Sequence, residues 1–261
     1  MHFTLSVIIP VFNEEENIAK IAFQVLECLT EIQDTEIIFI DDGSTDGTLA
    51  EIEQISLHNK NVFYLSLSRN FGHQNALRAG LDCANGDAVI TMDGDMQHPP
   101  EILPIMIAKW KEGNDIVFTV RQETSDTSWL KRKTSTLFYR LMNIMTGVQL
   151  HEGSADFRLM DRKVVNALKS MKENNMFYRG LISWVGFRQC SISYVPNARV
   201  HGRSKYSLQK MFRLALDGIT AFSFLPLRLA AAAGFCLAFF SFLYVLYALA
   251  IKLFTNHSVS G

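Results

Sequence analysis

Two aspartates separated by one glycine are the residues of this sequence best suited to chemistry. Asp93 and Asp95 come directly after an apolar run, 88–92, and Pro99 and Pro100 end the segment. Two carboxylates at the end of a buried strand need a positive partner, and hard oxygen ligands of this kind suit Mg²⁺ or Mn²⁺. A solvated turn is the alternative, because Asp-Gly is also a common loop signal.

More carboxylates follow the apolar runs nearer the N-terminus. Glu14 comes after the run Leu5–Val11, and Asp41 and Asp42 come after Glu36–Ile40. The carboxyl ends of parallel strands share one edge of a sheet, where open α/β sheets bind their ligands. Acidic side chains gathered there repel one another unless a cation or ligand N–H groups share the site. We therefore expect a ligand site with a divalent cation at this edge.

Hydrophobic periodicity predicts the elements that position these carboxylates. Uniformly apolar runs predict buried strands at Leu5–Val11, Glu36–Ile40, Val62–Leu67, 88–92 and Asp115–Val120. Amphipathic stretches predict helices over 14–29, from His73 to Ala84 and over 101–112. Another helix is expected after Asp41–Thr48, with Ser44 or Thr45 as its N-cap. Strands that alternate with helices in this way indicate an α/β fold, with a mostly parallel sheet flanked by helices on both faces.

Beyond Arg121 the pattern is less regular. It predicts a helix over 129–145, a strand ending near Met160, a helix to about Met171, a strand over 189–195 and a helix over 207–222. The last of these carries lysine and arginine among apolar residues, so it lies either in a membrane interface or against the main domain.

A long uncharged stretch near the C-terminus predicts a transmembrane helix. Leu229–Ile251 contains no charged residue, and a helix of this length spans roughly 34 Å, enough to cross a hydrocarbon core. A buried core helix is the alternative, but soluble helices rarely stay apolar on every face. Lys205, Lys210, Arg213 and Arg228 precede the stretch, so the positive-inside rule predicts that the N-terminal part is cytoplasmic.

Composition argues against several other classes of protein. The 25 basic residues nearly balance the 26 acidic ones, so no nucleic-acid partner is expected. The four cysteines have no C-x-x-C spacing, which predicts neither a zinc site nor a disulfide framework and fits a reducing compartment. The first apolar run follows no basic region, so no signal peptide is expected. It also lacks the glycines of a dinucleotide-binding turn or P-loop, which favours a metal-bridged diphosphate.

Four motifs in this order resemble family-2 glycosyltransferases with the GT-A fold. They are Val7–Glu14, Asp41–Gly47, Asp93–Glu101 and Ser154–Met160. The likeness covers nearly the whole chain and is greatest for polyprenyl-phosphate glycosyltransferases, namely the bactoprenol glucosyltransferases and the related dolichyl-phosphate mannose synthases. Residues 157–162 and 179–187 favour the bactoprenol branch. Members of that branch usually have two membrane spans, whereas this sequence predicts one.

The resemblance implies a role for each motif residue. The nucleotide sugar would be bound by Pro10, Phe12, Glu14, one or both of Asp41 and Asp42, Asp93 and Arg121. The Mg²⁺ or Mn²⁺ ion would be held by Asp93, Asp95 and Gln97. Asp156 matches the position usually named the catalytic base, and Asp95 is the second catalytic candidate. Phe12 as plain core and Gln97 as a turn residue are the alternatives, and we expect His98 to be structural rather than a ligand.

The implied reaction transfers a hexose, with glucose as the expected sugar, from a UDP-sugar to undecaprenyl or another polyprenyl phosphate, with inversion at the anomeric carbon. The product would serve lipopolysaccharide, O-antigen or other cell-envelope glycosylation. A phosphate monoester is already ionised near neutral pH, since its second pKa is about 6. We therefore expect Asp156 to orient a substrate rather than act as a strong base. The lipid phosphate would be bound by Arg179, Arg199, Arg203 and Lys205. Attraction of these residues to anionic headgroups of the bilayer is the alternative.

The predicted organisation is a cytoplasmic GT-A domain (1–200), a juxtamembrane segment (201–226), a transmembrane helix (227–254) and a tail (255–261), located at a bacterial inner membrane. The sequence does not decide between a monomer and a homo-oligomer. Alternative donors are GDP-mannose, as in dolichyl-phosphate mannose synthase, and other UDP-sugars. A processive polysaccharide synthase is disfavoured because the sequence has no Gln-x-x-Arg-Trp motif. A non-catalytic binding module would be expected to lack Asp93 or Asp95.

Overall fold

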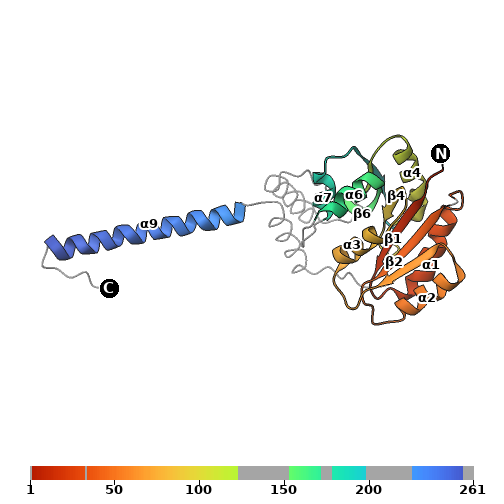
Figure 1. Ribbon diagram of the computed structural model, residues 1–261, viewed down its shortest axis with the longest axis horizontal. Coiled ribbons are helices and arrows are strands. Elements are labelled where there is room, and N and C mark those ends of the chain that lie inside the picture. The colour runs from red at the N-terminus through yellow and green to blue at the C-terminus, as the bar shows by residue number, and fades with distance from the viewer. Residues whose placement is uncertain (1, 33, 123–152, 172–177, 198–224, 255–261) are drawn as a thin grey trace.

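A seven-stranded sheet forms the centre of the protein in the computed structural model, which describes residues 2–32, 34–122, 153–171, 178–197 and 225–254 (Figure 1). The strands are β1 (Leu5–Val11), β2 (Thr35–Asp41), β3 (Val62–Ser66), β4 (Ala88–Thr91), β5 (Ile116–Arg121), β6 (Ser154–Asp161) and β7 (Gln189–Tyr194). Their order is β3-β2-β1-β4-β6-β5-β7. Only β6 runs antiparallel to its neighbours, β4 and β5. The predicted mostly parallel sheet is confirmed.

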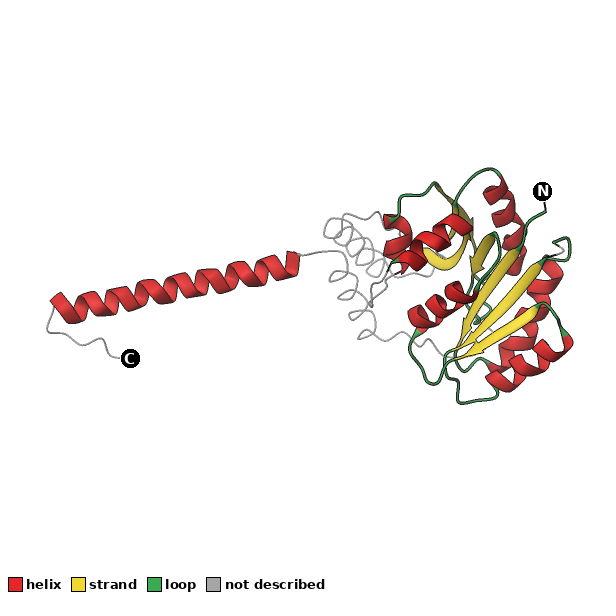
Figure 2. Cartoon of the chain, in the orientation of Figure 1, coloured by secondary structure: helices red, strands yellow, loops and turns green. Residues whose placement is uncertain are grey.

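Helices cover both faces of this sheet (Figure 2). They are α1 (Glu15–Cys28), α2 (Thr48–His58), α3 (His73–Cys83), α4 (Leu103–Lys111, after a 3₁₀ turn at Pro100–Ile102), α6 (Arg162–Ser170) and α7 (Tyr178–Trp184). One hydrophobic cluster joins the sheet to α1, α2 and α4, and a second joins it to α3, α6 and α7. Each boundary lies within a few residues of the predicted one where a prediction falls on described residues.

The central strand β1 is buried along its whole length because both of its faces are covered. Val7 and Ile9 enter the first cluster and Ile8 enters the second, as the two-residue period of a strand requires. Burying an aliphatic side chain of this size stabilises the fold by about 1.5–3 kcal/mol. The edge strand β3 differs from the predicted buried strand: Phe63 and Tyr64 are 49% and 41% exposed, since an edge strand has a neighbour on only one side.

Helix α3 packs unusually close to the sheet. A Cβ atom at Gly80 would collide with the side chain of Ile8, and Gly80 itself is buried. The missing side chain lets the helix backbone approach β1, as glycine commonly does where backbone must pass close to another element. This packing fixes the position of His73, the first residue of α3, near the carboxyl ends of the strands.

The predicted cap of α2 is wrong. The helix begins at Thr48, whose backbone N–H and hydroxyl both donate to Oδ1 of Asp46 (3.0 and 2.5 Å). Ser44 instead accepts a hydrogen bond from the backbone N–H of Asn13 (2.9 Å), and the backbone N–H of Thr45 donates to Asn13 Oδ1 (2.8 Å). These two residues tie the loop after β2 to the loop after β1, a long-range role that local spacing does not predict.

Helix α9 (Leu225–Phe254) stands clear of the sheet and its helices (Figure 1). Residues 227–254 have a mean hydropathy of 2.2, and the residues of their most apolar stretch are not buried against the rest of the described protein. Within the described ranges it is the one helix long and apolar enough to cross a membrane. At about 1.5 Å per residue, residues 227–254 span roughly 42 Å. The alternative of a buried core helix is therefore wrong, while the helices predicted over 129–145 and 207–222 lie outside the described residues.

Candidate active site

The turn that carries Asp93 and Asp95 is pressed against the end of β1. A Cβ atom at Gly94 would lie 2.5 Å from Cγ1 of Val11, so glycine is the residue that fits between the two aspartates. The backbone N–H of Gln97 donates to Oδ1 of Asp95 (3.2 Å). Both carboxylates are partly exposed. Sheet and turn together hold two hard oxygen ligands at the carboxyl edge, as the motif predicts.

His98 supports this turn from inside the core. Its Nδ1 accepts a hydrogen bond from the backbone N–H of Asp93 (3.0 Å), so the proton of a neutral ring lies on Nε2, which faces Oδ2 of Asp93 at 3.7 Å. The ring stacks on Phe157 with centroids 4.9 Å apart. Burial lowers the pKa of His98, against the opposing effect of the Asp93 and Asp95 carboxylates. A neutral, fully packed ring fits the structural role predicted for it.

Asp156 on β6 lies close to the same turn. Its side chain is 9% exposed and lies 3.5 Å from Nε2 of His73 and 3.8 Å from Nη2 of Arg158. The same Nε2 of His73 lies 3.6 Å from Oδ1 of Asp93. One imidazole therefore bridges two carboxylates that are 63 positions apart in the chain (156 − 93). Asp156 and the Asp93 turn belong to one site.

His73 and Arg158 are site residues that the sequence did not single out. His73 opens α3, and its contacts depend on how that helix packs on the sheet. Arg158 is 4% exposed and donates to the Ala155 carbonyl (2.9 Å) and to the Ser154 hydroxyl (3.2 Å), beside the carboxylate of Asp156. A charged residue in the middle of an apolar run was the available signal, because buried charges are seldom kept without partners.

Arg121 closes another side of the site. It is the last residue of β5, and its Nη2 donates to Oε1 of Gln97 at 3.1 Å. The strand pairing places it opposite Tyr194 at the end of β7. Arg121 is thereby brought to the Asp93–Gln97 turn, and its role near a diphosphate stays a prediction.

The acidic residues at the ends of β1 and β2 have protein partners. Asp41 accepts hydrogen bonds from the Ser44 N–H (3.0 Å) and the Ser66 hydroxyl (3.1 Å). Asp42 accepts from the backbone N–H groups of Phe71 and Gly72 (2.7 and 2.9 Å). The negative charge of these two carboxylates is hydrogen-bonded within the protein, and their sharing of a site with a cation stays a prediction. They shape the loops of the site, and direct contact with uridine stays a prediction.

The remaining residues predicted to bind the nucleotide lie at the end of β1 and in the loop that follows it. Pro10 is buried within β1, and Phe12 and Glu14 are partly exposed in the loop. Glu14 accepts a hydrogen bond from Nδ2 of Asn17 (2.7 Å), and its backbone N–H donates to the hydroxyl of Thr48 (2.9 Å). The loop is thus fixed beside the one that follows β2.

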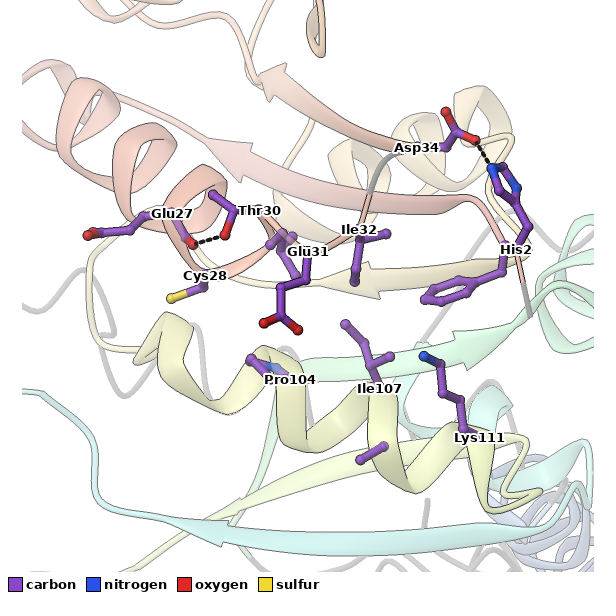
Figure 3. Close-up of a pocket in the computed structure, with 13 residues that line it drawn as sticks. His2, Glu27, Cys28, Thr30, Glu31, Ile32, Asp34, Pro104, Ile107 and Lys111 are labelled. Atoms are coloured by element: carbon purple, nitrogen blue, oxygen red, sulfur yellow. Dashed lines mark hydrogen bonds and ion pairs between the residues drawn. The ribbon is translucent and has the colours of Figure 1, made fainter.

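A hollow in the described structure lies away from these residues (Figure 3). Its volume is about 660 Å³, and its walls come from the end of α1, the segments that precede β1 and β2, and α4, with His2, Glu31 and Ile107 among the lining residues. This is the amino edge of β1 and β2, opposite the edge that carries the carboxylates. None of the predicted site residues lines it.

The sequence matches known proteins over most of its length. Residues 6–169 match the family described as Glycosyl transferase family 2. The chain is 42% identical over 261 residues to the "Uncharacterized glycosyltransferase YkcC" of Bacillus subtilis (strain 168). The aligned region covers 100% of this chain and 81% of the Bacillus protein. The chain belongs to glycosyltransferase family 2. It is also 43% identical over 242 residues to the "Bactoprenol glucosyl transferase" of Shigella phage SfV, covering 92% of this chain and 78% of that one.

Solved structures of glycosyltransferases share the fold. The mannosyltransferase PcManGT from Pyrobaculum calidifontis, in complex with GDP-Man and Mn2+, has a TM-score of 0.57 at 18% identity and covers 96% of this chain and 81% of its own. Glucosyl-3-phosphoglycerate synthase from Mycobacterium tuberculosis, in complex with Mn2+ and UDP-glucose, has a TM-score of 0.53 at 19% identity, covering 82% and 75%. At these identities the likeness establishes the GT-A fold.

The donor atoms at the turn of this family-2 glycosyltransferase fit a divalent ion. Asp93, Asp95 and Gln97 offer two carboxylates and an amide oxygen from one short segment. Within the described ranges no three histidine, cysteine, aspartate or glutamate side chains gather into a metal site. Two carboxylates with one amide leave coordination positions for water and phosphate oxygens, which is how Mg²⁺ is commonly held beside a nucleotide.

The residues predicted for the lipid phosphate lie largely beyond the described structure. Arg199, Arg203 and Lys205 fall within 198–224, outside the described residues. Arg179 belongs to α7, of which the backbone alone is described at that position. Their role in this glycosyltransferase stays a prediction.

Proposed function

We propose that this glycosyltransferase moves glucose from UDP-glucose to the phosphate of undecaprenyl or another polyprenyl phosphate, with inversion at the anomeric carbon. The contact of His73 with both Asp93 and Asp156 carries the proposal (3.6 and 3.5 Å). It brings the carboxylate assigned to the metal and the carboxylate assigned to the acceptor to one imidazole ring, so the donor and acceptor sites adjoin. The 43% identity to a protein named bactoprenol glucosyl transferase supports a polyprenyl acceptor.

The donor half of the reaction depends on the Asp93–Gln97 turn. A Mg²⁺ or Mn²⁺ ion held there by Asp93, Asp95 and Gln97 would act as a Lewis acid that neutralises the diphosphate leaving group. Arg121 adds a positive charge beside Gln97, to which it is hydrogen-bonded. The loop containing Phe12 and Glu14, fixed against the loop after β2, would receive the uridine.

The acceptor half requires little base catalysis. A phosphate oxygen of the lipid would attack the anomeric carbon, form the new carbon–oxygen bond, and displace the nucleotide diphosphate as the old bond breaks. Because a phosphate monoester has a second pKa of about 6, the attacking oxygen carries no proton that must be removed at neutral pH. Asp156, held between His73 and Arg158, would orient the substrates and favour the productive geometry.

We expect basic residues that follow β7 in the sequence to bind the lipid phosphate beside this site. The backbone N–H of Asn197 donates to the carbonyl of Gln97 (3.2 Å). This contact brings the chain to the metal-binding turn two residues before Arg199. We assign the lipid phosphate to Arg199, Arg203 and Lys205, with Arg179, and expect α9 to anchor the enzyme in a bacterial inner membrane with residues 1–200 in the cytoplasm.

Release of UDP by the purified full-length protein tests the function. We expect release from UDP-glucose when undecaprenyl phosphate and Mn²⁺ or Mg²⁺ are added, and a smaller rate with UDP-galactose, UDP-N-acetylglucosamine or GDP-mannose. Excess EDTA should abolish release, and Mn²⁺ should restore it. Turnover that survives complete chelation would refute the metal-dependent mechanism, and release that is independent of the lipid would refute the acceptor.

A further inference from the structure

Tyr194 ends β7 with a buried hydroxyl whose proton has no acceptor. The residue is 3% exposed, and no described group accepts a hydrogen bond from the hydroxyl; the guanidinium of Arg121, which can only donate, acts on the hydroxyl oxygen. Leaving a buried polar group unpaired costs about 1–3 kcal/mol. Most buried polar groups in folded proteins have a partner, so such a hydroxyl calls for a physical explanation.

The ring of Tyr194 is fixed on the inner side of the active site. It makes edge contacts with His98 (centroids 5.9 Å apart, planes at 73°) and with Phe157 (6.2 Å, 89°). His98 in turn supports the Asp93 turn through the Asp93 backbone N–H. The same aromatic packing therefore holds both the metal-binding turn and the tyrosine, which makes the hydroxyl position as well determined as that of the carboxylates.

Charged groups of the site act on the Tyr194 hydroxyl. Tyr194 pairs with Arg121 across β5 and β7, but the guanidinium of Arg121 donates to Gln97 (3.1 Å). Burial raises the pKa of Tyr194, the adjacent Arg121 guanidinium lowers it, and the carboxylates of Asp93 and Asp95 raise it. The phenol thus stays protonated at neutral pH and keeps a hydrogen that it can donate beside the turn and Arg121.

We propose that the Tyr194 hydroxyl donates a hydrogen bond to a phosphate oxygen of the nucleotide diphosphate bound at the Asp93–Gln97 turn. The inference rests on the proposed function, because the diphosphate is the donor's leaving group. Negative charge grows on that group as the glycosidic bond breaks, so a fixed O–H donor stabilises the transition state more than the ground state. The unpaired hydroxyl is then a binding group that finds its partner when the donor arrives.

The test is Tyr194→Phe in the full-length protein, which removes the hydroxyl and keeps the ring packing. We expect the unfolding temperature without ligand to be unchanged or higher, because a buried unpaired hydroxyl is lost. We expect affinity for UDP with Mn²⁺ to fall about 5- to 30-fold and affinity for uridine, which has no phosphate, to stay level. The kcat with UDP-glucose should fall about 10- to 100-fold, the range of a lost hydrogen bond to a charged group.

Tyr64→Phe is the matched control, since it removes the exposed hydroxyl that bonds Glu53 on the far edge strand (3.2 Å). It should leave all these quantities unchanged. A lower unfolding temperature of unliganded Tyr194→Phe would overturn the proposal, because the hydroxyl would then have a structural partner. An equal loss for UDP and uridine, or a loss confined to the lipid KM, would also overturn it. Failure of the wild-type protein to bind UDP more tightly than uridine would instead contradict the proposed function.

Discussion

At the scale of single residues, Asp156 and Asp95 differ in what holds them. Asp156 is 9% exposed and is flanked by His73 and Arg158. Asp95 is partly exposed on the Asp93–Gln97 turn, where it accepts a hydrogen bond from the backbone N–H of Gln97. The first arrangement fixes an orientation, whereas the second offers a ligand to an incoming cation. Removing the negative charge should therefore affect the two positions unequally.

We predict that Asp156→Asn retains at least 10-fold more activity than Asp95→Asn. The asparagine at 156 keeps the shape and a hydrogen-bonding oxygen, and the acceptor phosphate needs no strong base. The asparagine at 95 removes a charged ligand from the divalent ion. Single-turnover rates at saturating UDP-glucose and undecaprenyl phosphate measure the difference. The reverse order would show that Asp156 does essential proton transfer.

At the scale of elements, the Asp93–Gln97 turn depends on its fit against β1. Gly94 leaves no room for a Cβ atom beside Cγ1 of Val11, whose own side chain is 3% exposed. A β-branched residue has little rotational freedom at χ1, so Val11 cannot easily move aside. Adding one methyl group should push the turn away from the strand and spread its two aspartates.

We predict that Gly94→Ala weakens Mn²⁺-dependent UDP binding at least 10-fold and destabilises the fold by about 1–3 kcal/mol through overpacking. Val11→Ala in the same chain removes the opposing methyl groups and should restore much of the binding. Val11→Ala alone is the control and should lower the unfolding temperature while leaving UDP affinity near wild type. Simple additivity of the two changes would contradict steric coupling between the turn and β1.

At the scale of the whole molecule, an α/β body is joined to one apolar helix. The described part of the body buries its own core in two clusters. Helix α9 contributes to neither, and leaves large side chains such as Phe239 and Leu243 more than 40% exposed. Exposed apolar surface on this scale marks an interaction site, and the length of the helix matches a bilayer.

We predict that Phe239→Lys combined with Leu243→Lys releases the protein from carbonate-washed membranes. Each lysine near the centre of a span costs about 2.5–3.5 kcal/mol on insertion scales. UDP binding should persist, because the nucleotide site lies in the body, while transfer to bilayer-embedded polyprenyl phosphate should fall more than 10-fold. Lys252→Gln, at the end of the helix, is the control and should leave membrane association unchanged. Retention of the double variant in washed membranes would contradict a spanning role for α9.

The sequence by itself determined the elements and the principal carboxylates. Uniformly apolar runs can form only buried strands or helices, and their alternation with amphipathic stretches indicated the mostly parallel sheet. The Asp93-Gly-Asp95 turn was recognisable because strand-end acids and hard cations have matching chemistry. The uncharged C-terminal stretch identified α9 for the same local reason. Each of these features is encoded in the spacing of neighbouring residues.

Tertiary structure alone decided which side chains meet. His73 reaches Asp156 because Gly80 lets α3 pack closely on β1, and because antiparallel β6 lies beside β4. Asp41 at the end of β2 and Asp42 just after it proved to be hydrogen-bonded within the protein. Tyr194 proved to lie beside Arg121 through the pairing of β5 with β7. These contacts join residues far apart in the chain. Their partners are set by packing and register, which no local pattern of residue types records.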